Sequence, residues 1–102
     1  MIDTAEKLPT KQEFSDALDS CFQAHIADGP DFDLFLIEFE DIVSNATQEN
    51  YSLLFRATVD APPVQNIYRV EHETLGAMDL FLVPVKKDEN GLYYQAVFNR
   101  LL

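Results

Sequence analysis

The side chains of this 102-residue chain that first suggest nucleophilic catalysis or zinc binding are its one cysteine, Cys21, and its two histidines, His25 and His72. A nucleophilic cysteine needs a nearby base and an electropositive setting that lowers the pKa of its thiol. His25 follows Cys21 by four residues, a spacing that brings two side chains together only on a continuous helix. The turn-forming residues Gly29 and Pro30 indicate that the helix ends before His25. We therefore expect Cys21 to pack in the core on the apolar face of a helix.

The sequence gives equally little support for a metal site or for acid–base catalysis. Cysteine and histidine are too few and too irregularly spaced for a structural zinc module. Asp28, Asp31 and Asp33 surround Gly29 and could offer oxygen ligands to calcium, but the ligand spacing and terminal glutamate of an EF-hand are absent, which favours a solvated turn. No two carboxylates are placed across a predicted cleft, and all three glycines fall in predicted turns. The sequence thus predicts no catalytic residues, no metal site and no cofactor, so we do not expect an enzyme.

The charge balance excludes several classes of partner. The chain carries 18 acidic and 7 basic residues, for a formal net charge of −11. This surplus repels phosphate backbones and anionic lipid surfaces, so neither nucleic acid nor a membrane is an expected partner. A basic protein partner is compatible with the charge, although a purely solubilising role is favoured. No segment resembles a secretory signal, so we expect the chain to be in the cytoplasm when it is synthesised.

One helix is predicted near the start of the chain. Residues 1–9 are expected to form a flexible N-terminal arm, and residues 10–102 a single globular domain. Thr10 and Glu13 have the spacing of a capping box, which predicts a helix over about residues 11–22. Apolar side chains would then share one helical face: Phe14, Ala17, Leu18, Cys21 and Phe22.

The rest of the sequence has the period of two that is typical of strands. Strands are predicted at 32–43, 51–59, 67–72, 78–85 and 92–99, with a sixth either at 24–26 or from division of 32–43. The stretch FDLFLIEFEDIV (32–43) has apolar residues at both odd and even positions. Such a strand is either covered on both faces or shifted in register by a bulge. Consecutive hairpins make the sheet antiparallel. The predicted fold class is α+β, mainly β, with the helix packed on a curled sheet or small barrel of about six strands.

Several charged residues lie inside predicted strands. These are Arg56, Arg69, Glu71 and Asp79. If the sheet curls, we expect them to form cross-strand ion pairs, with the guanidinium of Arg56 or Arg69 within hydrogen-bond reach of a strand carboxylate. This is a structural role rather than a binding role.

Three segments carry a family resemblance: YSLLFRA (51–57), PPVQNIYRVEHETLGAMDLFLVPV (62–85) and GLYYQAVFN (91–99). Together they resemble a family of bacterial domains of unknown function, over most of residues 10–99. The resemblance brings no catalytic residues and implies motif positions only: Arg56, Arg69, Glu71, His72, Leu75, Gly76 and Asn99. It also implies a partner, because genes of this family often neighbour those of proteins similar to phage tail-collar or tail-fibre proteins. The stretch 32–43 is more aromatic than its usual counterpart, so a partner surface specific to this chain could lie there.

We therefore expect a non-enzymatic structural or protein-interaction domain, an accessory or assembly partner of a phage-tail-like fibre or collar protein. Its incorporation into an extracellular or virion-like assembly, or into a homo-oligomer, is compatible with the sequence. The alternative is a β-barrel that binds a small ligand or peptide with an aromatic interior: Phe35, Phe39, Phe55, Tyr68, Phe81 and Tyr94. Such a barrel requires an enclosed pocket of about 300 Å³ or more, whereas in a domain of this size the same aromatic residues also suit a plain core.

Overall fold

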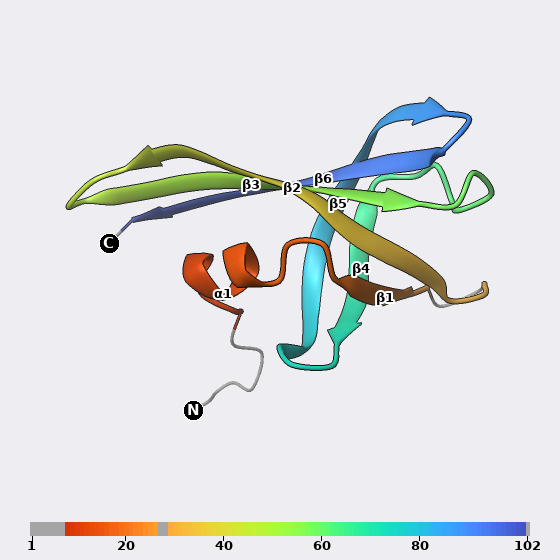
Figure 1. The fold of residues 1–102 in the computed structure, drawn as a ribbon, viewed down its shortest axis with the longest axis horizontal. Helices are drawn as coiled ribbons and strands as arrows, with labels where there is room; N and C mark the ends of the chain where they lie inside the picture. The colour runs from red at the N-terminus through yellow and green to blue at the C-terminus, as the bar shows by residue number, and fades with distance from the viewer. Residues whose placement is uncertain (1–7, 27–28, 102) are drawn as a thin grey trace.

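The structure, a computed structural model, describes residues 8–26 and 29–101, so most of the predicted N-terminal arm lies outside the described residues. One short helix, α1 (Lys11–Asp16), precedes six antiparallel strands: β1 (Cys21–His25), β2 (Phe32–Ser44), β3 (Gln48–Ala57), β4 (Asn66–His72), β5 (Gly76–Asp88) and β6 (Gly91–Leu101). They close into a barrel in the order β1-β2-β3-β6-β5-β4 (Figure 1). The expected mainly β fold of six antiparallel strands is confirmed. Within the described ranges, no helix is long and apolar enough to cross a membrane.

Three strands continue beyond the closed part of the barrel. The far halves of β2, β3 and β6 run outward together as a flat ribbon, with α1 beneath it (Figure 1). We call this ribbon, residues 38–44, 48–53 and 97–101, the three-stranded extension. Phe14 is fully buried beneath it, with its ring centroid 6.4 Å from that of Tyr51 and 5.3 Å from that of Phe98. The helix therefore covers an apolar face that the extension would otherwise expose to water.

The helix is shorter than the sequence predicts. The capping box forms as expected, because Glu13 N–H donates to Thr10 Oγ1 over 3.1 Å and Thr10 N–H donates to Glu13 Oε1 over 2.8 Å. The helix nevertheless ends at Asp16, and Asp19 has a φ of 69°, in the left-handed region that breaks a helix. From Asp19 onward the backbone bonds to β2, with Asp19 N–H donating to the Leu36 carbonyl over 2.8 Å. The prediction of a helix over 11–22 is thus wrong in its second half, because strand pairing takes up the backbone groups there.

This change of structure reverses the expected position of Cys21. In a helix Cys21 and Phe22 would share the apolar face, but in β1 they point to opposite faces of the sheet. Phe22 is buried and Cys21 is exposed. Leu18, another residue of the predicted apolar face, is 40% exposed in the turn. The prediction that Cys21 packs in the core is therefore wrong.

A bulge in β2 explains why apolar residues occupy both odd and even positions of this strand. Its register against β3 shifts between Leu36 and Glu38. Before the shift Leu34 and Leu36 face the barrel interior and Phe35 faces outward, whereas after it Phe39 turns toward the core. Phe81 of β5 also faces outward, so Phe35 and Phe81, at 40% and 54% exposed, are not interior residues as predicted.

Side chains fill the barrel. The interior aromatic residues pack edge to face, with the ring centroids of Tyr68 and Tyr94 6.0 Å apart and those of Phe22 and Phe55 5.3 Å apart. Fully buried aliphatic residues close the remaining space: Leu34, Leu36, Leu53, Val70, Leu80 and Leu82. Because this core occupies the barrel, its outer face and its strand edges are what remain for recognition.

Candidate interaction surface

Two of the predicted strand charges form an ion pair. Arg69 and Asp79 are opposite each other on β4 and β5, and Arg69 Nη1 lies 3.2 Å from Asp79 Oδ1. Glu71, the next outward residue of β4, has its Oε1 3.3 Å from His25 Nε2 on β1. His25 Nδ1 lies 2.7 Å from Asp31 Oδ1, and this hydrogen bond is the main reason that the pKa of His25 is raised. These half-exposed pairs link the outer faces of β1, β4 and β5, and we call them the seam. Each pair contributes little to stability.

His72 fixes a turn. Its Nδ1 accepts hydrogen bonds from the backbone N–H groups of Thr74 and Leu75, over 3.1 and 3.2 Å. Nδ1 is therefore unprotonated, and the ring proton sits on Nε2, which donates to Ser20 Oγ over 2.8 Å. The Ser20 hydroxyl in turn donates to the Ala17 carbonyl. A general base would have to accept the hydroxyl proton of serine, which is the reverse of this arrangement, so Ser20 and His72 hold the chain in place.

Cys21 lies near His72 without facing it. Both residues border an open hollow of about 660 Å³. The ring centroid of Phe22, on the opposite face of β1 from Cys21, lies 4.4 Å from that of His72, so the imidazole belongs to the inner face of the sheet. Partial loss of solvation around the thiol, followed by the negative charge of Asp33, raises the pKa of the exposed Cys21. Its surroundings therefore disfavour the thiolate that a nucleophile requires.

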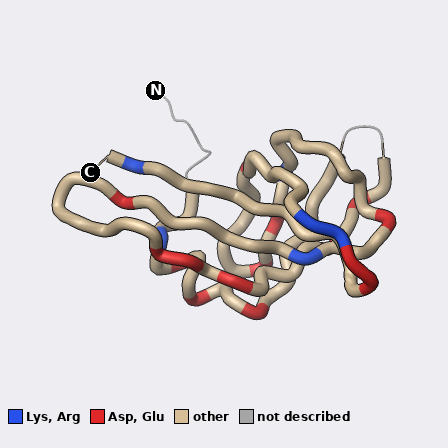
Figure 2. The backbone as a smooth tube through the Cα atoms, turned by 90° about the horizontal axis from the view of Figure 1, so that it is seen from above, with Lys and Arg blue, Asp and Glu red and all other residues tan. Residues whose placement is uncertain are grey.

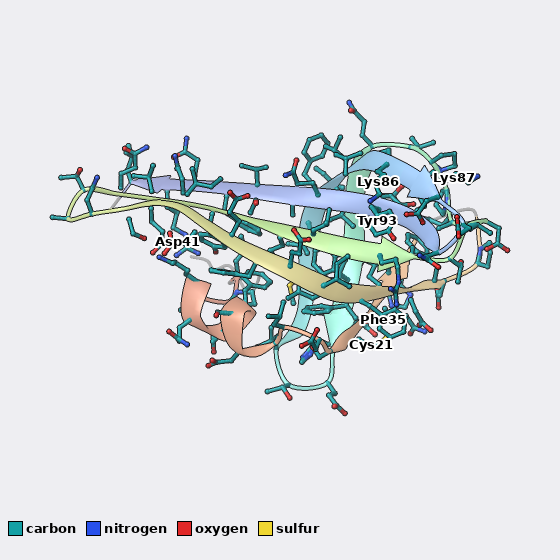
Figure 3. The ribbon with its side chains drawn as sticks, turned by 45° about the horizontal axis from the view of Figure 1, so that its top comes forward. Cys21, Phe35, Asp41, Lys86, Lys87 and Tyr93 are labelled. Carbon is teal, nitrogen blue, oxygen red and sulfur yellow. The ribbon has the colours of Figure 1, made fainter. Side chains whose placement is uncertain are left out.

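A row of cations and aromatic rings crosses the outer face of four strands. Strand register places Phe35 of β2 beside Arg56 of β3, Arg56 beside Tyr93 of β6, and Tyr93 beside Lys86 of β5. Arg56 Cζ lies 5.8 Å from the centroid of the Phe35 ring, and Lys86 Nζ lies 4.6 Å from that of Tyr93. We call these four residues the cation–aromatic row. Figure 3 shows Lys86, Tyr93 and Phe35 in this order down one side of the barrel, with Cys21 beyond Phe35.

Basic residues gather around the row. Lys87 follows Lys86 on β5, so three of the seven basic residues of the chain lie at this end of the barrel. In the tube coloured by charge, basic stretches lie near one another at this end, and an acidic stretch directly follows the longer of them (Figure 2). Asp88 offsets part of this charge, because its carboxylate lies 3.8 Å from Lys86 Nζ and accepts a hydrogen bond from the Tyr93 hydroxyl over 3.3 Å.

Comparison with known proteins identifies the family. The family model described as domain of unknown function DUF6916 matches residues 9–98. The chain belongs to this family. No curated protein and no solved structure matches the chain.

The motif positions of this DUF6916 domain do not gather at one site. Arg69, Glu71 and His72 lie along β4, in the seam and the turn described above. Asn99 is exposed far along β6, opposite Asn50 in the three-stranded extension. Only Arg56 belongs to the cation–aromatic row. Among the residues that the structure describes, no group of three histidine, cysteine or acidic side chains could hold a metal ion.

The sequence did not reveal the cation–aromatic row. Its residues come from four strands and are 21, 37 and 7 positions apart along the chain, so only strand register brings them together. One signal was available within β3 of this DUF6916 domain. In YSLLFRA the apolar positions alternate, which places Arg56 on the outer face, opposite to Phe55 and Ala57.

Proposed function

We propose that this DUF6916 domain is a non-enzymatic interaction module that binds an acidic segment of a phage-tail-like fibre or collar protein. The observation that supports it best is the cation–aromatic row, in which Lys86 and Phe35 are exposed, Arg56 is half-buried and the Tyr93 ring is buried beneath Lys86, on a chain with a net charge of −11. The choice of a tail-like partner comes from the resemblance of the sequence. The choice of an acidic segment comes from the charge of the row.

The row has the features of a binding hot spot. Arginine and tyrosine are enriched among residues that dominate binding energy, and lysine and arginine bind carboxylates through charge-assisted hydrogen bonds. Arg56 lies between the Phe35 and Tyr93 positions on neighbouring strands, which restricts its motion before a partner arrives. Less conformational entropy is then lost on binding.

Strand geometry suggests the spacing of the carboxylates. Arg56 and Lys86 lie two strands apart, on β3 and β5 with β6 between them. Adjacent strands are about 4.8 Å apart, so the two cations are separated by about 10 Å. Carboxylates seven residues apart on a helix are separated by about 10.5 Å, so two turns of an acidic helix match this surface.

The small-ligand or peptide-binding barrel has weaker support. Of the six aromatic residues that it requires inside, Phe35 and Phe81 face outward. Phe55, Tyr68 and Tyr94 are packed in the core, where the Tyr94 hydroxyl donates to the Pro62 carbonyl. These side chains occupy the space that a ligand would need.

Co-expression with the tail-collar-like or tail-fibre-like product of the neighbouring gene tests the proposal, with co-purification and then calorimetry as readouts. The double variant Arg56→Gln and Lys86→Gln removes both cations and lowers the net charge by two. The control Ala46→Glu and Gln65→Glu lowers it equally, at two exposed loop positions away from the row.

We expect the wild type and the control to bind, and the double variant to lose at least about tenfold in affinity, as the loss of two charge-assisted contacts implies. Equal binding by the double variant and the control would rule out the row as the binding surface. Failure of the wild type to bind either product would rule out the tail-like partner.

A further inference from the structure

The last part of β6 forms an edge of the sheet. Up to Gln95 the strand pairs with β3 on one side and β5 on the other. From Ala96 to Leu101, within the described part of the chain, β3 alone pairs with it. Figure 2 shows this segment along the margin of the three-stranded extension. Its second edge therefore presents unpaired backbone N–H and carbonyl groups, which is the usual template for pairing with another strand.

This edge carries no acidic side chain, and its one charged residue, Arg100, is paired with Glu49 of β3, with Arg100 Nη1 3.7 Å from Glu49 Oε2. The opposite edge of the extension, β2, carries Glu38, Glu40 and Asp41. β6 (GLYYQAVFNRL) contains no acidic residue, although acids make up 18 of the 102 residues of the chain. Instead, Val97 and Leu101 are 63% and 87% exposed. Proteins usually discourage edge pairing with charged side chains, and here the β2 edge carries three acids whereas the β6 edge carries one cation that is already paired.

We propose that two copies of this chain pair through residues 97–101 of β6, antiparallel and about a two-fold axis at Asn99. In that register Val97 lies opposite Leu101 of the second copy on the outer face, and Asn99 lies opposite its own counterpart. On the other face Phe98 lies opposite Arg100, and both keep their contacts within their own chain, Phe98 with Phe14 and Arg100 with Glu49. The segment is self-complementary about Asn99, as a two-fold interface requires. The pairing joins two extensions into one six-stranded sheet.

The acidity of the chain weakens this dimer without preventing it. Each copy carries a net charge of −11. The acidic edge β2 lies two strands from β6, or about 10 Å, beyond the Debye length of about 8 Å at physiological ionic strength. The repulsion is therefore largely screened at the interface, and added salt should strengthen the dimer. Because the paired segment is only five residues long, the interface is at the small end of specific contacts, and association is expected to be weak.

Cysteine cross-linking tests the register in the full chain, with Cys21→Ser in the background to remove the native thiol. The two-fold axis places the two Asn99 Cα atoms about 4.5–5.5 Å apart, within the range that a disulfide can bridge. The Val97 Cα atoms of the two copies are offset by four residues along the strands, or about 14 Å, which a disulfide cannot span. With diamide as oxidant, Asn99→Cys should form a covalent dimer, and Val97→Cys should form at least tenfold less.

Sedimentation velocity between about 5 and 500 μM tests the same dimer without cross-linking. Val97→Lys places a charge on the edge and should weaken dimerisation at least tenfold. Ile67→Lys is the matched control, because Ile67 is 65% exposed and Val97 is 63% exposed. It should leave dimerisation unchanged, because Ile67 lies on β4 and not on the β6 edge. A wild type that stays monomeric at 500 μM and 0.5 M salt, or equal cross-linking at positions 97 and 99, overturns the proposal. Neither result bears on the cation–aromatic row.

Discussion

Two hairpin glycines offer a matched test of how closely β3 and β6 approach each other. Gly76 begins β5 with a φ of 84°, and Gly91 begins β6 with a φ of 151°. Both conformations disfavour side chains. A Cβ added at Gly76 would meet nothing within 4 Å, whereas one at Gly91 would lie 2.0 Å from the Ala57 carbonyl oxygen and 3.1 Å from Arg56 Cγ. The change to alanine therefore separates the cost of the backbone angle from the cost of the contact.

The magnitudes follow from these two geometries. Gly76→Ala should lower the free energy of unfolding by about 1–2 kcal/mol, the usual cost of a left-handed conformation for an L-residue. Gly91→Ala carries a backbone cost of about 1–3 kcal/mol. It must also move β6 away from β3 by about 1 Å, which adds about 1–3 kcal/mol, as overpacking does. We expect a total of about 2–6 kcal/mol, centred on about 4 kcal/mol, a large share of the roughly 5–15 kcal/mol that holds a domain folded.

Urea denaturation and thermal unfolding, each followed by circular dichroism, measure the difference. One kcal/mol corresponds to about 4–8 °C for a domain of this size, so the melting temperature should fall by about 4–16 °C for Gly76→Ala and, at about 4 kcal/mol, by about 16–32 °C for Gly91→Ala. Equal losses in the two variants would refute the close approach of Gly91 to Ala57. A Gly91→Ala protein that melts higher than Gly76→Ala would refute it outright.

Three further predictions concern the core, a buried hydroxyl and the seam. Phe14→Ala should lower the free energy of unfolding by about 3–5 kcal/mol in urea denaturation, because Phe14 is fully buried between α1 and the extension. Tyr94→Phe should cost about 1–2 kcal/mol in the same assay, since the Pro62 carbonyl loses its donor. The raised pKa of His25 means that its bond to Asp31 stabilises the fold fully below the ordinary pKa of about 6.5 and is lost as pH rises through the folded pKa. His25→Gln should therefore flatten the pH dependence of unfolding above pH 6, by no more than about 1 kcal/mol because the partner carboxylates are half exposed.

The parts of the fold that the sequence predicts correctly depend on interactions between residues that are close together along the chain. The capping box at Thr10 needs only one helical turn, and it forms as predicted. Tyr51, Leu53 and Phe55 alternate with polar or outward residues, and all three are buried. The hairpin at 88–91 follows from the turn preference of its Asn-Gly pair. Each of these signals is complete within a few residues.

The errors arise where distant partners decide the structure. Residues 21 and 22 fit a helical face and also fit an alternating strand. Pairing with β2 and β4 selects the strand. In the same way, Phe35 and Phe81 have the hydrophobicity of core residues, but they face outward because of the register of β2 against β1 and of β5 against β4. A single sequence contains no direct signal for these registers, so the cation–aromatic row could not be predicted either.

Together the filled barrel and the two proposed surfaces suggest how one small domain could contact two partners at once. Tyr93 of the row and Asn99 of the edge are six residues apart on β6, or about 20 Å, so neither surface blocks the other. Their physics differs. Contacts between Arg56 or Lys86 and carboxylates weaken as salt screens them, whereas the pairing of two acidic copies strengthens as salt screens their repulsion. Raising the salt from about 0.05 to 0.5 M should therefore weaken partner binding and strengthen dimerisation in the same sample. If both processes weaken together, charge attraction also holds the copies together, and the β6 edge is not their interface.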